Sequence, residues 1–360
     1  MSAADADGGA DDAMTRLTRD ARTIVSDLTT DASAVETYGA THGATLNESD
    51  VSMLVKLFQT FSADDGDAWR RTSTSAGADV YRRASADAST RAHQVLGVTE
   101  TRASADDVFE FFSAASEFDR HFGILDDMFK GGDVLSFRLY DHMLEGDARG
   151  GVSMSGDGER EGKRRGFGGG FGGALRRGPR FGELFERLEK NAKSLQGEHE
   201  HAADASSSSS LSSVSTAKKP LAASSALSAV PKESPTNPLG CRPGHAILRG
   251  TFKLPSIIRD RDFVWEQLTM KMPNGAVVVA AQSIENGVVN AVAPPLEGHV
   301  RGSILVSGYY AVPNPKTGGS TLYYVVQADP KGQLPMWVVN LVAPDQAQNV
   351  ARLRNHLDSK

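Results

Sequence analysis

This 360-residue chain has few cysteines, no long apolar run and no targeting signal at its N-terminus, and each of these absences limits the classes of protein it can belong to. Its single cysteine, Cys241, excludes an intramolecular disulfide, so we expect a reducing compartment such as the cytosol. No apolar run reaches the roughly 18–20 residues that a membrane-spanning helix needs. The acidic N-terminus has neither the apolar core of a secretory signal nor the arginines of a transit peptide. We therefore expect a cytoplasmic protein that touches membranes only transiently.

Apolar residues make up only 39% of the chain, whereas Gly, Ala, Ser and Asp are abundant. This composition favours one packed core together with long stretches that do not pack. The net charge of −6 argues against bulk attraction to nucleic acid, so no nucleic-acid partner is expected. The chain is expected to be a monomer.

Composition divides the chain into four parts. The segment 145–242 is rich first in Gly and Arg and then in Ser and Ala, and such sequence buries too little surface to offset its chain entropy. We predict a mostly disordered insertion there, with a candidate amphipathic helix at 181–195. The insertion interrupts one domain, formed by 47–144 and 243–360. The extension at 1–46 is expected to be partly helical, from Met14 onward, and otherwise disordered.

The two parts of the domain contain apolar patterns typical of short strands and of helices. One helix is predicted to begin at Ser104, with Ser104 as its N-cap and Asp107 as the capping-box acid. A helix is predicted from about Asn47, where Asn47 or Ser49 could cap it. The runs predicted as strands are 79–82, 92–98, 133–140, 246–252, 263–272, 276–283, 300–312 and 322–327. Turn signals such as Pro273-Asn274-Gly275 favour an antiparallel meander. With a last helix from about Met336 to Leu357, the predicted fold class is α+β.

The order of several short motifs resembles a known family. In chain order they are Arg261-Asp262-Phe263-Val264, His299-Val300-Arg301-Gly302, Ser307-Gly308-Tyr309, the run 327–340 and the run 348–354. With Trp69, Val80-Tyr81-Arg82 and 104–112, they resemble the START (StAR-related lipid transfer) family over about 47–143 and 243–358. The resemblance implies a helix-grip fold, in which a curved antiparallel sheet wraps around a long C-terminal helix. It also implies a hydrophobic cavity that holds one lipid.

Candidate lipid-binding residues follow from this resemblance. The loop 286–298 would be a lid at the cavity mouth, and the alternative is an ordinary connection whose valines pack inward. Sterol-binding members tend to have an arginine where this chain has Gln267, which weakens a sterol assignment without excluding it. Sterol, phospholipid, sphingolipid and fatty acid all stay open as ligands. The full set is Gln267, Val288, Val289, Val292, Leu296, Met336 and Val339. Apolar side chains suffice for the tail, since burying each CH₂ contributes roughly 0.8 kcal/mol.

Two arginines of the matching motifs are expected to be structural. Arg261 and Arg301 would pair with acids such as Asp262 or Asp329 to hold strands and loops together.

The insertion contains both basic and aromatic residues. This combination suggests a second binding site, separate from the lipid cavity. Such a segment can bind RNA or an anionic lipid surface. The candidate helix favours a membrane, with Arg176, Arg177, Phe181 and Phe185 as contact residues. The alternative is a spacer without a partner.

Motifs for catalysis are missing from the sequence. There is no His-Glu-x-x-His metal site and no Gly-x-Ser-x-Gly elbow, and the run 198–201 (Glu-His-Glu-His) is interpreted as solvated loop. We therefore expect no enzyme, no cofactor and no metal. A lipid carrier and a lipid-sensing regulatory protein remain alternatives.

Overall fold

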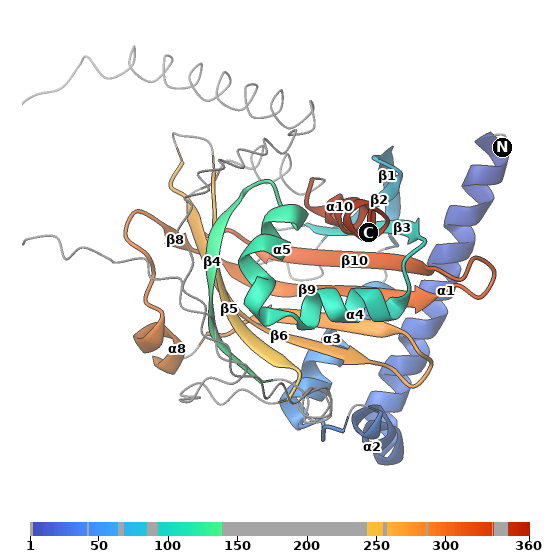
Figure 1. Ribbon diagram of the computed structural model, residues 1–360, viewed down its shortest axis with the longest axis horizontal. Coiled ribbons are helices and arrows are strands. Elements are labelled where there is room, and N and C mark those ends of the chain that lie inside the picture. Colours follow the sequence, from blue (N-terminus) through green and yellow to red (C-terminus); the bar gives the residue numbers. More distant parts are fainter. Residues whose placement is uncertain are drawn as a thin grey trace, which may run out of the picture.

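The protein contains one large antiparallel sheet with helices on both of its faces (Figure 1). The computed structural model describes residues 3–41, 43–63, 68–84, 93–138, 243–254, 258–285, 287–332, 334 and 345–360. The insertion predicted at 145–242 therefore lies outside the described residues, together with its candidate helix. None of the described helices combines the length and apolar character needed to cross a bilayer.

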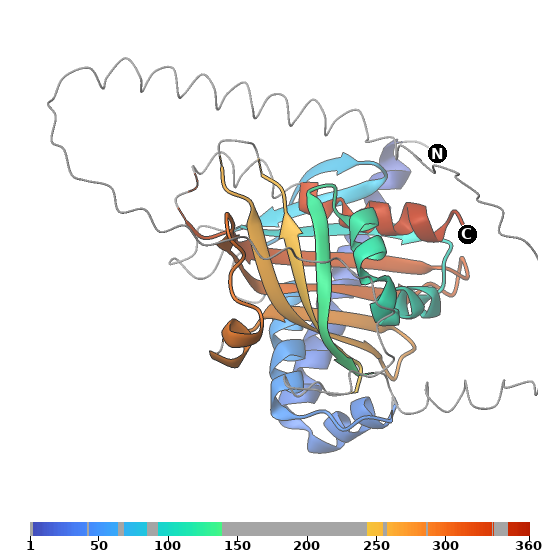
Figure 2. The same cartoon turned by 60° about the vertical axis from the view of Figure 1, so that its left-hand side comes forward.

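The sheet has the strand order β1-β2-β3-β10-β9-β7-β6-β5-β4, and every neighbouring pair in this path is antiparallel. The short strand β8 pairs with β6 in parallel. The strands span Arg70–Ser75 (β1), Ala78–Arg83 (β2), Gln94–Thr101 (β3), Phe129–Arg138 (β4), His245–Phe252 (β5), Arg261–Lys271 (β6), Val277–Ser283 (β7), Val300–Arg301 (β8), Ser303–Pro313 (β9) and Ser320–Asp329 (β10). The sheet is strongly curved in the part formed by β4, β5 and β6 (Figure 2).

Three helices cover the outer face of the sheet: α1 (Ala3–Thr30), α2 (Ala32–Ala40) and α3 (Glu48–Ser62). Asn47 caps α3 as predicted, because its side chain accepts from the Asp50 N–H while the Asp50 carboxylate accepts from the Asn47 N–H. Phe58 of α3 packs edge-on against Tyr310 of β9, with ring centroids 5.2 Å apart. Gly308 lets α3 approach closely, since a Cβ there would lie 2.7 Å from Leu57.

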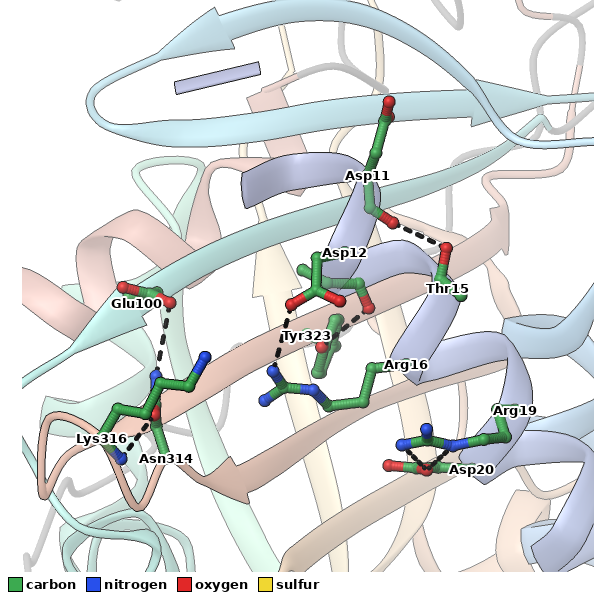
Figure 3. Close-up of polar contacts among 11 residues, drawn as sticks. Asp11, Asp12, Thr15, Arg16, Arg19, Asp20, Glu100, Asn314, Lys316 and Tyr323 are labelled. Carbon is green, nitrogen blue, oxygen red and sulfur yellow. Dashed lines mark hydrogen bonds and ion pairs between the residues drawn. The ribbon is translucent and has the colours of Figure 1, made fainter. Parts of the chain in front are cut away.

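The helix α1 begins earlier than the sequence predicted, at Ala3 rather than near Met14. Once packed turns have nucleated a helix, adding an Ala-rich turn with acids near the N-terminus costs little. The packed part of α1 lies along the sheet. There the Tyr323 hydroxyl of β10 donates to the Ala13 carbonyl at 3.0 Å, and Arg16 faces Asp12 at 3.5 Å (Figure 3).

The inner face is covered by α4 (Ala105–Ser113), the 3-10 turn η1 (Ala115–Glu117), α5 (Phe118–Leu125) and α10 (Asn349–Leu357). Close packing of α10 on β3 depends on Gly97, where a Cβ would lie 2.1 Å from the Ala347 carbonyl oxygen. The expected beginning of this last helix, near Met336, lies outside the described residues. A curved antiparallel sheet gripping a C-terminal helix is the helix-grip α+β fold that the sequence predicted.

Candidate functional site

A cavity of about 130 Å³ lies between the inner face of the sheet and the elements that cover it. Its floor is built by alternation, because every second residue of a strand points to the same face. The floor residues come from β6, β7, β9 and β10: Phe263, Trp265, Gln267, Val279, Ala281, Ser307, Tyr309, Tyr324 and Val326. The walls come from α4, α5, the link from α5 to β4, and α10, with Phe112, Phe122, Leu125, Met128 and Asn349. Most of this lining is apolar.

Aromatic side chains fix the shape of one wall. Trp265 is fully buried and lies edge-on to Phe118, with ring centroids 5.7 Å apart, and 5.4 Å from the ring of Phe122. The spacing Phe118–Phe122 places both rings on the same side of α5, facing the sheet. Large buried rings of this kind supply most of the packing energy of a wall and keep it in place.

Several polar residues line the cavity, among them His93, Arg261, Gln267 and Gln346. Five others are linked to one another or act on one another by charge, and we call them the polar end: Asp126, Ser307, Tyr309, Tyr324 and Asn349. Tyr309 and Tyr324 face each other across β9 and β10 and stack with ring centroids 4.3 Å apart. Tyr324 shares hydrogen bonds with Ser307 and Asn349. The Asp126 carboxylate accepts from the Met128 N–H at 2.8 Å.

Burial raises the pKa values of Asp126, Tyr309 and Tyr324 in the polar end. Loss of water raises the pKa of Asp126 to about 6, although the Met128 N–H and the charge of Arg352 oppose this shift. Burial also raises the pKa of Tyr324 to about 12 and that of Tyr309 well above its usual value, and the charge of Asp126 adds to both. At neutral pH the two tyrosines are therefore neutral.

Arg352 of α10 joins the helix to the link from α5 to β4. Its guanidinium lies 3.1 Å from both the Asp127 and the Asp345 carboxylates and donates to Asn349 Oδ1 at 2.7 Å. It also donates to the Leu125 carbonyl at 3.4 Å. Together these bonds hold α10 over the polar end.

The structure brings only one of the predicted lipid-binding residues into the described lining of the cavity. This residue is Gln267, which is 7% exposed. Val289 belongs to α8 (Gly287–Val292) and is buried against Ile247 and Val264, whose side chains lie on the other face of the sheet. In the same loop, Leu296 is half-buried and Val292 is exposed. The predicted residues Met336, Val339, Arg176, Arg177, Phe181 and Phe185, and the side chain of Val288, lie outside the described part of the structure.

Arg301 and Arg261, the two arginines predicted to be structural, differ in their partners. Arg301 pairs with the fully buried Asp262 at 2.7 Å and also donates to the Ala293 carbonyl. Arg261 donates to the carbonyls of Pro330 at 2.6 Å and Lys331 at 3.0 Å, so its hydrogen-bond partners are carbonyl oxygens. The carboxylate of Asp329 accepts from the Lys331 N–H instead. These bonds fix the segments at the start of β6 and the end of β10.

A second buried polar cluster lies under α3 and was not found from the sequence. His245 Nε2 lies 3.1 Å from Asp50 Oδ1, and His245 Nδ1 lies 2.8 Å from Glu266 Oε1. Burial alone would lower the pKa of His245, but the hydrogen bonds and charges of the two carboxylates outweigh it and raise this pKa. These three residues also have the composition of a metal site. Because each imidazole nitrogen already faces its own carboxylate, a protonated histidine satisfies the cluster without a metal.

Part of the chain matches a known family in sequence. Residues 249–357 match the START domain family model. No curated protein matches the chain in sequence. Among solved structures, human STARD10 is 13% identical, covers 88% of this chain and 80% of its own length, and gives a TM-score of 0.45. The human StarD13 (DLC2) lipid transfer and protein localization domain is 15% identical, with 87% and 98% covered and a TM-score of 0.43.

A bacterial structure is similar to about the same extent. The STAR-related lipid transfer protein from Xanthomonas axonopodis (fragment 25–204) is 15% identical, with 81% of this chain and 99% of that chain covered and a TM-score of 0.42. The part matched by the family model begins in β5 and ends in α10, so it includes all of the cavity floor. In this region the chain is therefore similar to the START domain family.

Proposed function

We propose that this protein binds one lipid in the cavity and carries it between membranes. The observation that supports this proposal is a mostly apolar cavity with a few polar residues, whose floor lies in the part of the chain that matches the START domain family model. Such a lining holds a hydrocarbon tail by burial and orients a head group with a few polar side chains. The proposal requires no catalytic group.

The size of the cavity adds a mechanical requirement. About 130 Å³ is similar to an engineered cavity of about 150 Å³ that holds benzene, so a long-chain lipid needs the walls to move apart. The wall with the fewest direct bonds to the sheet is expected to move. Since Arg352 holds α10 to Asp127 and Asp345, opening at α10 breaks those bonds.

Transfer between vesicles tests the proposal. Full-length protein is mixed with donor vesicles that contain a fluorescent lipid and with unlabelled acceptor vesicles, and the rate of transfer is measured. Ala281→Trp fills the cavity from the floor, and we expect it to abolish both binding and transfer. Thr317→Trp adds the same bulk on an exposed turn and serves as the matched control. Equal transfer by both variants would contradict a cavity-bound lipid, whereas binding without release would favour a sensor.

We propose further that Val292 contacts the membrane during transfer. It is 46% exposed, and it is the single large apolar side chain that the described residues expose to this degree. Val289 anchors α8 on the sheet, which leaves Val292 free to insert. Val292→Asp is expected to weaken co-sedimentation with vesicles and to leave the thermal stability unchanged. Undiminished vesicle binding by this variant would contradict the contact.

The insertion is proposed as a second membrane contact, on the basis of its sequence alone. Basic residues such as Arg176 and Arg177 each add roughly 1 kcal/mol near an anionic surface. Deleting 145–242 is expected to reduce salt-sensitive co-sedimentation with vesicles that contain phosphatidylserine. Unchanged, salt-sensitive binding after the deletion would remove this role.

A further inference from the structure

The polar end of the cavity contains a hydrogen-bond donor that no described residue uses. Tyr309 is 6% exposed and lines the cavity, and its hydroxyl makes no hydrogen bond with another described residue. A hydroxyl at a cavity wall needs a partner from water or from a ligand. A polar atom of a ligand would satisfy it.

An acceptor lines the same cavity as this donor. Asp126 is 5% exposed, and its carboxylate accepts one hydrogen bond from the described residues, from the Met128 N–H. A carboxylate can accept further hydrogen bonds. A donor and an acceptor in one cavity match a group that both accepts and donates.

The charges around the polar end disfavour an anionic head group. Two arginines are relevant among the described residues. Arg352 already lies between the carboxylates of Asp127 and Asp345. Arg261 lines the cavity, but its guanidinium already donates to the backbone carbonyls of Arg259, Pro330 and Lys331. With Asp126, three acids surround Arg352. A phosphate or sulfate placed there would meet net negative charge in a poorly hydrated site.

The arrangement of the rings disfavours a cationic head group. An aromatic cage binds an ammonium group through open ring faces. Here Tyr309 and Tyr324 stack on each other at 4.3 Å, and Phe112 packs on Tyr309 with ring centroids 4.8 Å apart. The faces of Tyr309 are therefore covered, which leaves its hydroxyl edge for recognition.

We propose that the polar end selects an uncharged lipid with a hydroxyl group, whose oxygen accepts from the Tyr309 hydroxyl while its own O–H donates to Asp126. This inference rests on the proposed function, since it assigns the head-group chemistry of the same cavity. The rest of the lining, including Gln267 and Trp265, then encloses the beginning of the tail.

Two probes with the same tail and different heads test the selection. Hexadecan-1-ol carries a hydroxyl, whereas hexadecyl sulfate, used below its micelle concentration, carries a permanent negative charge. Their affinities for the full-length protein are measured at pH 7.5 by displacement of the neutral fluorophore 1-aminoanthracene. We expect the alcohol to bind at least about tenfold more tightly than the sulfate.

Two variants test whether Tyr309 and Asp126 cause the difference in affinity between the alcohol and the sulfate. Tyr309→Phe removes one hydrogen bond and is expected to lower the affinity for the alcohol about three- to tenfold, without changing that for 1-chlorohexadecane. Tyr310→Phe is the matched control, because Tyr310 is the next residue of β9 and packs against Phe58 on the opposite face. Asp126→Asn is expected to raise the affinity for the sulfate about tenfold, since it removes the nearest negative charge.

The outcomes separate this inference from the proposed function. Equal affinities for alcohol and sulfate, or a Tyr309→Phe variant that binds the alcohol like the unmodified chain, overturn the hydroxyl-binding role. In that case the tails still bind and the cavity keeps its proposed function. Failure of every sixteen-carbon probe to bind overturns the proposed function itself. Circular dichroism of each variant confirms that it is folded before its affinity is interpreted.

Discussion

Two buried polar clusters lie on opposite faces of the same sheet, and they differ in how far the chain satisfies them. On the outer face, His245 faces a carboxylate with each of its ring nitrogens, those of Asp50 and Glu266. On the inner face, Asp126 and Tyr309 line the same cavity with no hydrogen bond between them, and the Tyr309 hydroxyl lacks a partner among the described residues. Both clusters are removed from solvent.

The difference separates a stabilising role from a binding role. A buried cluster whose groups satisfy one another contributes to holding α3 on the sheet, and removing one member leaves a charge without compensation. A cluster with spare donors and acceptors costs free energy until a ligand completes it. Stability should therefore depend on the outer cluster, and ligand selection on the inner one.

The largest effect on stability is expected from His245→Ala. The substitution leaves Asp50 buried without its cation, so the free energy of unfolding should fall by about 3–5 kcal/mol. Denaturant unfolding followed by circular dichroism measures this. His299→Ala is the control, because the His299 side chain bonds only the nearby Glu297 carbonyl, and little change is expected there. If His245→Ala lowered the free energy of unfolding as little as the control does, the outer cluster would have no stabilising role.

The outer cluster also predicts a pH dependence. The pKa of His245 is raised in the folded protein, so its contribution to stability is fully present below the unfolded pKa near 6.5. The contribution is lost as the pH rises through the folded value. The stability difference between the unmodified chain and His245→Ala should therefore shrink above about pH 6.5. A difference that stays constant up to pH 9 would show that His245 does not act through its charge.

A smaller effect with the opposite sign is expected from Asp126→Asn. Since burial raises the pKa of Asp126 from 3.8 to about 6, its ionised form destabilises the ligand-free protein at neutral pH. The variant should be more stable by about 1–3 kcal/mol at pH 7.5, and the gain should vanish below about pH 4. The control Asp12→Asn, on the exposed side of α1, should show no change. A stability loss at pH 7.5 would mean that Asp126 has partners that its burial does not reveal.

Much of the fold was predictable because the central strands are short runs rich in apolar residues, bounded by turn signals. The predicted runs at 246–252, 263–272 and 276–283 correspond closely to β5, β6 and β7. In contrast, β1 was not predicted, because Arg70–Ser75 is polar on both faces and is almost entirely exposed. The helix α5 was also missed, since eight residues give too short a pattern for helical periodicity to stand out.

The site was less predictable than the fold. Gln267 could be singled out because the family resemblance points to its place in a strand, and a regular strand then fixes the face on which its side chain lies. Asp126 stands at the end of a short helix, and its burial results from elements far apart in the chain. The same is true of His245, whose partners Asp50 and Glu266 come from α3 and β6. Tertiary packing creates such clusters, and local sequence carries no signal for them.

The smallest effect on stability is expected from Tyr309→Phe, and this small size is itself informative. If the Tyr309 hydroxyl has no partner in the ligand-free protein, removing it should leave the free energy of unfolding unchanged or raise it slightly, by up to about 1 kcal/mol. Denaturant unfolding of the lipid-free protein measures this, with Tyr310→Phe as the control on the outer face. A loss of more than about 1 kcal/mol would show that the hydroxyl is already paired. The inner cluster would then be as satisfied as the outer one, and the contrast between binding and stabilising roles would fail.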